Sequence, residues 1–574
     1  MALSAPVVRR VNGPVVEVEG TDAGMLELVE VGAERLPGEV IALDGAAATV
    51  QVYAYTGGLR PGDPVARTGH PLRAELGPGL LGGVFDGLLR RLSGAGELLL
   101  DGGLGTTLDH ERRWRFTPAV STGDVVEAGA VLGEVPETVA IAFRVTVPPG
   151  LRGAVEWVAA SGEVTVDEPV ARIAGTEVTL AHRWPVRLPR PVHERLRADV
   201  PLHTGQRVLD VLFPIARGSS AAVPGGFGTG KTVLLQQIAK WCDADVIVYV
   251  GCGERGNEMA DVLEEMACLD DPRTGRALLD RTVLVANTSN MPVLAREASI
   301  YTGVTVAELY RDMGYDVVLI ADSTSRWAEA LREVSSRTGE LPAEEGYPAG
   351  LASALAAFYE RSGRVRTPSG ADASVTILGA VSPAGGDMTE PVSAHTRRFV
   401  RCIWSLDAEL AYARHYPAVS WRDSSSRDAE QIAEWHVASQ DPGWSALRDR
   451  AMRLLADADH LESVAQLVGA TSLPDSERVT LLTGRLLREA VLQQSSLSPN
   501  DAACAPAKQR ALLALVLAVH DACLSLAGRA VAASSIEAVD LSAATRARDE
   551  TGPDDAAGVD AVRDRLLGAL GRLG

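Results

Sequence analysis

The run at residues 225–232, Gly-Gly-Phe-Gly-Thr-Gly-Lys-Thr, constrains this chain more than any other feature. It has the form G-x-x-x-x-G-K-[ST], in which backbone N–H groups curl around phosphate, the Lys reaches the outer phosphates and the hydroxyl is offered to Mg²⁺. Such a loop needs a strand before it and a helix after it, and β-prone residues 219–223 and helical residues 233–241 supply both. The residues predicted to hold phosphate are Gly225, Gly226, Phe227, Gly228, Thr229, Gly230, Lys231 and Thr232.

The chain contains three lysines and fifty-two arginines, and one of the lysines is Lys231. A compact ammonium on a flexible stem fits inside the curled loop, whereas a planar guanidinium is wider and prefers two-pronged partners. A chance Gly-rich turn ending in Lys is the alternative interpretation. The strand and the helix on either side favour the phosphate-binding loop.

Length, charge and cysteines limit the possible functions. A chain of 574 residues is too long for one hydrophobic core, so three or four domains are expected. A net charge of −20 argues against a general grip on nucleic acid, which needs a basic surface. Six scattered cysteines favour a reducing cytoplasm over secretion, and the N-terminus lacks a signal pattern. The longest apolar run, Ala511–Val519, is short of a membrane span, so we expect the chain to serve any membrane from outside the bilayer.

The order of the patterns predicts a multidomain α/β protein with four domains. Residues 1–70 show short strands and frequent turns, typical of a small β-barrel, and residues 111–183 form an inserted β-rich domain. Residues 71–110 and 184–435 form a nucleotide-binding core, and residues 436–574 show helical periodicity. The core strands, apolar on both faces as in a parallel sheet covered by helices, are Val246–Gly251, Thr282–Ala286, Val317–Ala321 and Val375–Ala380.

The inserted domain has a spacing of Val, Gly and Asp residues between 120 and 133 that is similar to a lipoyl-like sandwich. A covalently attached lipoyl or biotinyl group requires a lysine. Residues 1–230 contain none, so we interpret this domain as a scaffold.

Two acidic residues follow apolar strands of the core. Glu254 lies in Gly-Cys-Gly-Glu-Arg after the strand at 246–250, and we expect this strand to lie next to the phosphate loop. From there Glu254 can orient the attacking water, and Arg255 can offset the charge of the phosphoryl group. The alternative for Glu254 is a first-turn acid of the helix that follows. Asp322 ends the strand that starts at Asp316 and is predicted to hold Mg²⁺ directly or through water, although an Asp after an apolar strand is common.

An aromatic residue is the candidate for a wall against adenine. Tyr416 lies in Arg-His-Tyr-Pro-Ala after a helical stretch, and aromatic faces stack on bases. A core or surface tyrosine is the alternative interpretation.

These blocks carry a resemblance to a known family. The segments Gly251–Met259, Asn287–Pro292, Arg296–Gly303, Ala321–Leu331 and Gly346–Ala349 are similar to those of the catalytic A subunit of V/A-type rotary ATPases. The resemblance runs from about residue 10 to about residue 500 and includes the inserted domain, which the β subunit of F-type enzymes lacks. It implies a RecA-like core.

The resemblance implies a hexameric A3B3 ring with ATP or ADP at the subunit interfaces. Thr232 and Asp322 would serve Mg²⁺, Lys231, Glu254 and Arg255 would serve hydrolysis, and Arg326 could approach the same phosphates. The B subunit would supply a further arginine in trans. Central and peripheral stalk subunits are the other implied partners, and the membrane is reached only through the rotary complex, on its cytoplasmic side. The moved ion, H⁺ or Na⁺, and the working direction are open.

The chain departs from the family pattern at four positions. Gly226 stands where relatives often have Pro, and Thr229 where vacuolar relatives carry a redox-sensitive Cys. Tyr416 replaces a usual Phe, and Leu497 aligns with an aromatic residue of the adenine pocket. Leu497 would pack against adenine but lose aromatic stacking, a change on the order of 1 kcal/mol.

Three other functions share this type of core. A non-catalytic ring subunit would bind nucleotide, but it does not need Lys231, Thr232 and Glu254 together. An RNA-translocating hexameric ATPase is disfavoured by the acidic charge and by the insertion. A type III secretion ATPase is expected to lack the insertion.

Overall fold

The computed structural model describes residues 5–92, 106–271, 273–338, 340–439 and 441–573. The chain forms two compact units, and each is described by itself. The first unit contains the described residues up to 197 together with 218–220 and 244–400. The second contains residues 198–217, 221–243 and the described residues from 401 onward.

The N-terminal strands form an antiparallel sheet of order β1-β2-β5-β4-β3-β6. A bridge between Val7 and Pro64, flanked by amide hydrogen bonds from Val8 and Val65, joins the first strand to the last. The sheet therefore closes into the predicted β-barrel around a core of mostly valine side chains. The sequence pattern missed β6. The strands are β1 (Val7–Asn12), β2 (Val15–Glu19), β3 (Glu27–Val31), β4 (Leu36–Asp44), β5 (Ala47–Val52) and β6 (Val65–Pro71).

The inserted domain consists of two four-stranded antiparallel sheets, of order β10-β13-β15-β16 and β12-β11-β9-β14. A two-stranded ribbon of β7 and β17 precedes and follows it, so the chain leaves and returns along paired strands. The predicted β-rich composition is confirmed. The strands are β7 (Arg73–Leu76), β9 (Trp114–Pro118), β10 (Val125–Val126), β11 (Val131–Pro136), β12 (Ala142–Thr146), β13 (Gly153–Val158), β14 (Gly162–Val164), β15 (Pro169–Ile173), β16 (Thr176–Thr179) and β17 (His182–Pro185).

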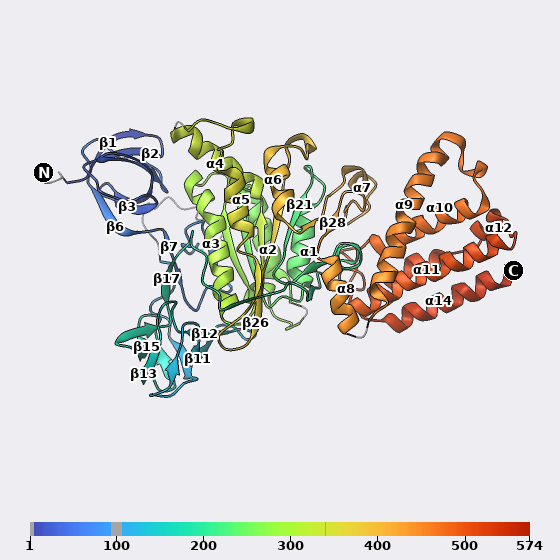
Figure 1. Ribbon diagram of the computed structural model, residues 1–574, viewed down its shortest axis with the longest axis horizontal. Coiled ribbons are helices and arrows are strands. Elements are labelled where there is room, and N and C mark those ends of the chain that lie inside the picture. The colour runs from blue at the N-terminus through green and yellow to red at the C-terminus, as the bar shows by residue number, and fades with distance from the viewer. Residues whose placement is uncertain (1–4, 93–105, 272, 339, 440, 574) are drawn as a thin grey trace. The chain divides into compact units, whose positions relative to one another are not determined.

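The core of the first unit is a parallel sheet of order β26-β24-β22-β23-β8, with β25 and β18 antiparallel at the β26 side. All residues of β22 and β23 are buried, as a sheet covered on both faces requires. Helix α3 lies against β22 and β24 and packs on α4 (Figure 1). The strands are β8 (Val84–Phe85), β18 (Glu194–Leu196), β22 (Val246–Cys252), β23 (Thr282–Asn287), β24 (Asp316–Asp322), β25 (Gly363–Arg366) and β26 (Asp372–Val381). The helices are α2 (Gly256–Cys268), α3 (Val293–Asp312), α4 (Thr324–Thr338), α5 (Leu351–Tyr359) and α6 (Pro391–Phe399).

Strand β22, which leads to Glu254, is central in this sheet. Its two edges are occupied by β23 and by β24. Apolar runs predict that strands are central but contain no information on which of them are neighbours.

The second unit contains the phosphate loop and the helical domain. The loop follows β21 and opens α1, as predicted. The other strands are short, and β21 pairs with β27 in parallel. The strands are β19 (Pro201–Leu202), β20 (Ile215–Ala216), β21 (Ser220–Pro224), β27 (Cys402–Ile403) and β28 (Ser425–Ser426), and the first helices are α1 (Lys231–Trp241), α7 (Ala408–Tyr412) and α8 (Ala429–Ala438).

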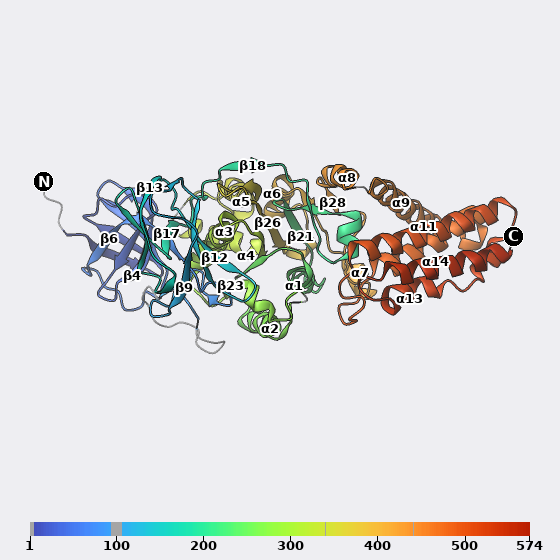
Figure 2. The ribbon, with the colours of Figure 1, turned by 90° about the horizontal axis from the view of Figure 1, so that it is seen from below.

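The helical domain confirms the predicted periodicity. Helices α11, α13 and α14 lie side by side, and α10 packs against α9 and α11 (Figures 1 and 2). A short connection separates the last two helices, since α13 ends at Glu550 and α14 begins at Ala556. The helices are α9 (Trp444–Val468), α10 (Asp475–Leu487), α11 (Pro506–Gly528), α12 (Ala533–Glu537), α13 (Ser542–Glu550) and α14 (Ala556–Leu570).

Helix α11 alone, among the helices of the described residues, is long and apolar enough to cross a membrane, with a mean hydropathy of 1.9. The apolar run predicted from sequence is therefore extended by helical residues on both sides. Half of the window is buried inside the protein, and the helix packs against α9, α10 and α14. It also buries Lys508 and Gln509, so its apolar character is that of a core helix.

Candidate active site

The phosphate loop of the second unit has the backbone that its sequence predicts. Gly228 and Gly230 have φ values of +79° and +87°, which favour glycine. A Cβ at Gly225 would lie 2.7 Å from the Thr229 hydroxyl oxygen and 2.8 Å from Leu406, so only glycine fits there. Around Gly226 and Gly228 the positions of a Cβ are open within 4 Å. The loop therefore presents an uncovered backbone at the N-terminus of α1, where the helix dipole favours an anion.

Polar side chains of the loop are folded onto its own carbonyl groups. The Lys231 ammonium donates to the carbonyl oxygens of Gly225 at 2.6 Å and Gly226 at 3.0 Å. The Thr229 hydroxyl donates to Gly226 at 2.9 Å. Thr232 is the second residue of α1. Phe227 is 95% exposed at the outer side of the loop.

The two residues predicted to contact adenine lie near the loop in the same unit. A Cβ at Gly230 would lie 3.8 Å from Cε1 of Tyr416. The carbonyl oxygen of Tyr416 accepts a hydrogen bond from the Gln494 amide at 2.8 Å, three residues before Leu497. Tyr416 is 45% exposed and Leu497 is 94% exposed, so both leave apolar surface available to a ligand.

In the first unit, a tight turn after β22 places Glu254. Gly253 has φ +75°, and its amide donates to the Asn287 carbonyl at 2.7 Å. A Cβ at Gly253 would lie 2.8 Å from Cβ of Arg326 and 3.1 Å from Cδ of Arg296, so glycine is required. The carbonyl of Glu254 accepts from the Ser289 amide, which fixes the turn beside the end of β23.

Asp322 ends β24, whose register with β22 pairs Asp322 with Gly251. Its side chain is buried, and Oδ2 accepts a hydrogen bond from the Tyr249 hydroxyl at 3.0 Å. The two predicted carboxylates of Asp322 and Glu254 therefore come from the carboxyl ends of neighbouring strands.

The pKa of Glu254 is raised to about 7, first because burial disfavours its charged form and then because of the charge of Asp322. Glu258, one helical turn further on, raises this pKa by a hydrogen bond and by its charge, while Arg326 lowers it. A carboxyl group that titrates near neutral pH suits proton transfer at that pH.

The two predicted arginines differ in their surroundings. Arg255 is exposed at the N-terminus of α2. Arg326 lies in the first turn of α4 and forms an ion pair with Glu329 at 3.0 Å. The positive charge of Arg326 also acts on Glu254, so the structure brings this arginine close to the predicted catalytic carboxylate.

Sequence analysis missed Tyr249 and Glu258, which act on the two carboxylates, and Arg296, which packs against Gly253. The i,i+4 spacing of Glu254 and Glu258 was a signal that could have been used. Tyr249 is hidden in an apolar strand, and Arg296 comes from α3, so neither shows a local pattern.

The residues fit a nucleotide with a divalent cation. The carboxylate of Asp322, which accepts a hydrogen bond from the Tyr249 hydroxyl, is an oxygen ligand of the kind that Mg²⁺ prefers. The described residues contain no group of three or more His, Cys, Asp or Glu that could enclose a metal.

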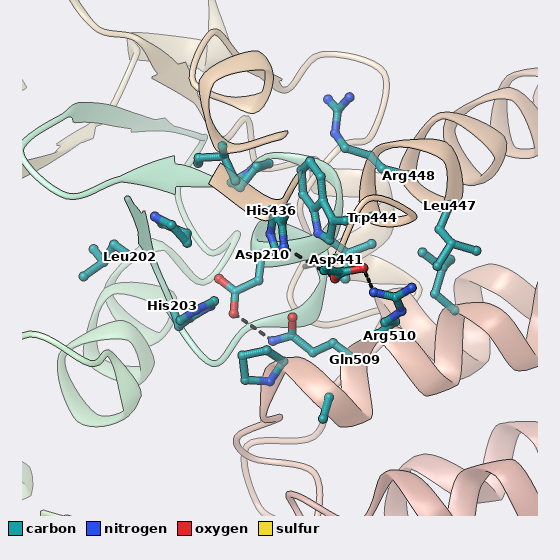
Figure 3. Close-up of a pocket in the computed structure, with 17 residues that line it drawn as sticks. Leu202, His203, Asp210, His436, Asp441, Trp444, Leu447, Arg448, Gln509 and Arg510 are labelled. Atoms are coloured by element: carbon teal, nitrogen blue, oxygen red, sulfur yellow. Dashed lines mark hydrogen bonds and ion pairs between the residues drawn. The ribbon is translucent and has the colours of Figure 1, made fainter. Parts of the chain in front are cut away.

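A separate cavity of about 150 Å³ lies in the second unit, between residues 201–214 and helices α8, α9 and α11 (Figure 3). Its polar groups are paired with one another: Gln509 donates to Asp210 at 2.8 Å, and Arg510 pairs with Asp441. The ring of His436 stacks on Trp444, and burial lowers the pKa of His436 to about 4. The cavity contains none of the predicted site residues, so we interpret it as part of the packing of the helical domain.

Comparison with known sequences identifies four family domains along the chain. The matched residues are 8–69 for the ATP synthase alpha/beta family beta-barrel domain, 105–187 for the ATP synthase alpha/beta subunit barrel-sandwich domain, 205–426 for the ATP synthase alpha/beta family nucleotide-binding domain and 433–533 for the C-terminal domain of V and A type ATP synthase.

Curated relatives match over most of their length. The A subunit of the A-type ATP synthase of Methanoculleus marisnigri is 52% identical over 88% of this chain and 87% of the relative. The V-type ATP synthase alpha chain of Anaeromyxobacter sp. (strain K) is 53% identical over 92% of both chains. The A subunit of the A-type ATP synthase of Haloferax volcanii is 49% identical over 93% of this chain and 92% of the relative.

A solved structure supports the fold. The assembled ATPase EscN from the type III secretion system of enteropathogenic E. coli has a TM-score of 0.64 and covers 89% of this chain and 100% of its own chain. At 22% identity, this likeness concerns the fold alone.

Proposed function

This chain belongs to the family of the A subunits of A-type ATP synthases and the alpha chains of V-type ATP synthases, and on this basis we propose roles for its individual residues. The members of this family are the catalytic subunits of these enzymes. The phosphate loop, Gly225–Thr232, binds the phosphates of ATP or ADP. Lys231 exchanges its two loop carbonyls for phosphate oxygens when the nucleotide binds. The open positions around Gly226 and Gly228 support this role.

Glu254 is the residue that orients and polarises the attacking water. Its raised pKa and its place at the carboxyl end of β22 support this role. Arg255 and Arg326 offset charge on the phosphoryl group; Arg326 would exchange its surface pairing with Glu329 for this contact. Tyr416 and Leu497 form the wall for the base.

Thr232 and Asp322 would hold Mg²⁺, which when bound neutralises phosphate charge during transfer. Tyr249 keeps the Asp322 carboxylate in place through its hydroxyl. A cation bound to Asp322 would relieve the repulsion between Asp322 and Glu254 and would thereby lower the pKa of Glu254.

We propose that the chain works in a ring of alternating A and B subunits, with central and peripheral stalks as further partners and with an arginine supplied in trans by the B subunit. The four domains, with boundaries at about residues 70, 110, 183 and 435, have different roles. The N-terminal barrel makes ring contacts, the inserted domain is a scaffold, the nucleotide-binding core carries the chemistry and the helical domain contacts the rotor. ATP hydrolysis or synthesis is coupled through this complex to H⁺ or Na⁺ movement, from a peripheral position on the cytoplasmic side of the membrane.

The observation that carries the proposal is the titrating carboxyl of Glu254 next to the Asp322 that ends the neighbouring strand. The test compares Glu254→Gln and Glu258→Gln in rings assembled with the partner B chain. We expect Glu254→Gln to bind Mg-ATP normally and to lose turnover by about 10² to 10⁴-fold, the range for a general base. Glu258→Gln should keep most turnover, because Glu258 acts only on the charge of Glu254. Loss of ATP binding in Glu254→Gln would show that Glu254 is structural.

A further inference from the structure

Lys508 is a fully buried lysine that no step of the proposed chemistry uses. It lies in the first turn of α11, and its side chain has no exposed surface. Its ammonium donates to three backbone carbonyl oxygens: those of Asn500 at 2.9 Å, Arg548 at 2.7 Å and Thr551 at 2.9 Å. All three N–H bonds of the ammonium therefore have an acceptor.

Two of these carbonyls belong to the C-terminal end of α13. Arg548 is in its last turn and Thr551 follows it directly. The last carbonyls of a helix have no partner within the helix, and the dipole makes this end negative. Lys508 is part of α11 but caps the C-terminal end of α13. Its positive ammonium group binds the free carbonyls there and is favoured by the negative end of the helix dipole.

The third carbonyl belongs to the segment that carries Leu497. We call residues 493–501 the base loop, because Leu497 is its proposed contact to adenine. Asn500 contributes its carbonyl to Lys508 and also donates from its side chain to the Asp549 carbonyl at 2.9 Å. A single ammonium therefore joins the base loop to the end of α13.

Other contacts hold the two ends of the base loop. The buried Arg207 donates to the Gln493 carbonyl and to the Asp501 carboxylate, both at 2.6 Å. Arg548 donates to the Gln493 carbonyl at 2.7 Å. Leu497 itself is 94% exposed, so its position depends on the ends of the loop rather than on packing of its own side chain.

Composition indicates that an ammonium is required at this place. In a chain with three lysines and fifty-two arginines, Lys231 and Lys508 both donate to backbone carbonyl groups through a compact ammonium. A planar guanidinium presents its donors in a flat fork and does not match three converging carbonyls.

We propose that Lys508 is the positioning residue of the base loop: it holds Leu497 at the height of the adenine ring by linking the loop to α13. This inference rests on the proposed function, since it takes Tyr416 and Leu497 as the base wall. Lys508 acts on the base alone, because its contacts involve the base loop and α13 but no residue of the phosphate loop.

The test separates the base from the phosphates by using two ligands with the full-length chain. ATP carries both, and inorganic tripolyphosphate carries the phosphate chain alone. Lys508→Met keeps the stem and removes the three donors. We expect it to weaken ATP binding about five- to tenfold, which is part of the apolar contact of one leucine side chain, and to leave tripolyphosphate binding within about twofold of wild type.

The matched control is Arg546→Met, which removes an exposed cation from α13, the helix that Lys508 caps. This variant should change the affinity for neither ligand. Lys508→Arg retains the charge and keeps the inference testable if Lys508→Met does not fold. We expect Lys508→Arg to weaken ATP about two- to threefold and tripolyphosphate not at all.

Equal weakening of both ligands by Lys508→Met would overturn the inference, because Lys508 would then support the fold in general. Wild-type affinity for ATP in Lys508→Met or in Lys508→Arg would also overturn it. If the wild-type chain itself binds ATP no more tightly than tripolyphosphate, the base wall of the proposed function fails, and this inference fails with it.

Discussion

Replacing Glu254 by Gln is expected to stabilise the nucleotide-free chain at alkaline pH, even though it removes the residue proposed to activate water. In the folded chain the pKa of Glu254 is about 7, against an ordinary value of 4.5, because of burial, Asp322 and Glu258. The difference of about 2.5 corresponds to at most about 3.5 kcal/mol, at about 1.4 kcal/mol for each unit of pKa. Glu254 is partly exposed, so solvent screening reduces this to about 1–2 kcal/mol.

The sign of the effect follows from proton binding. Between pH 4.5 and 7, the folded chain binds more protons at Glu254 than the unfolded chain does, so this group lowers stability as the pH rises through that window. The loss is complete above pH 7 and absent below pH 4.5. Gln does not titrate, so the variant gains most at pH 8 and converges with wild type near pH 4.5.

The assay is thermal unfolding of the nucleotide-free chain at pH 8 and at pH 5, with Glu264→Gln as control. Glu264 is exposed on the same helix α2, and its replacement should change stability by less than about 0.5 kcal/mol. We expect a higher unfolding temperature for Glu254→Gln at pH 8 and a smaller difference at pH 5. A variant less stable than wild type at pH 8, or a gain of equal size at both pH values, would refute the reasoning.

Three further outcomes are expected. The isolated chain should hydrolyse ATP slowly, and addition of the matching B subunit should raise the rate steeply; full turnover by the pure chain would exclude an arginine in trans. Leu497→Phe should tighten ATP about fivefold by adding a stacked ring, measured by calorimetry with tripolyphosphate as the unchanged control ligand. Arg207→Met should destabilise the second unit by about 3–5 kcal/mol, because it leaves the Asp501 carboxylate buried without its partner at 2.6 Å. An Arg207→Met variant that unfolds at the same denaturant concentration as wild type would contradict this.

Local chemistry explains why much of the fold and part of the site could be predicted. The loop at 225–232 has a glycine wherever φ is positive, and its strand and helix are adjacent in sequence. Continuous apolar runs identified β22, β23, β24 and β26, because strands covered on both faces need them. The candidate residues Glu254 and Asp322 follow directly from the ends of such runs.

The remaining features depend on residues that are distant in sequence. Nothing near β22 indicates that its neighbours are β23 and β24, because strand order is set by helix crossovers. The short strand β8 joins β23 from about two hundred residues earlier, and its two residues form no pattern. The carbonyl cluster around Lys508 combines three separate segments, so only the tertiary structure reveals it.

Because this chain has only three lysines, the reaction of an amine-specific reagent with its side chains can be assigned to individual residues. A reagent that acylates primary amines can modify three side chains, and each reports a different property. The rate at Lys231 reports occupancy of the phosphate loop, and the rate at Lys240 reports the C-terminal end of α1. The rate at the buried Lys508 reports opening of the helical domain. Acylation followed over time by mass spectrometry would thus read nucleotide binding and local unfolding from the native chain without an engineered label.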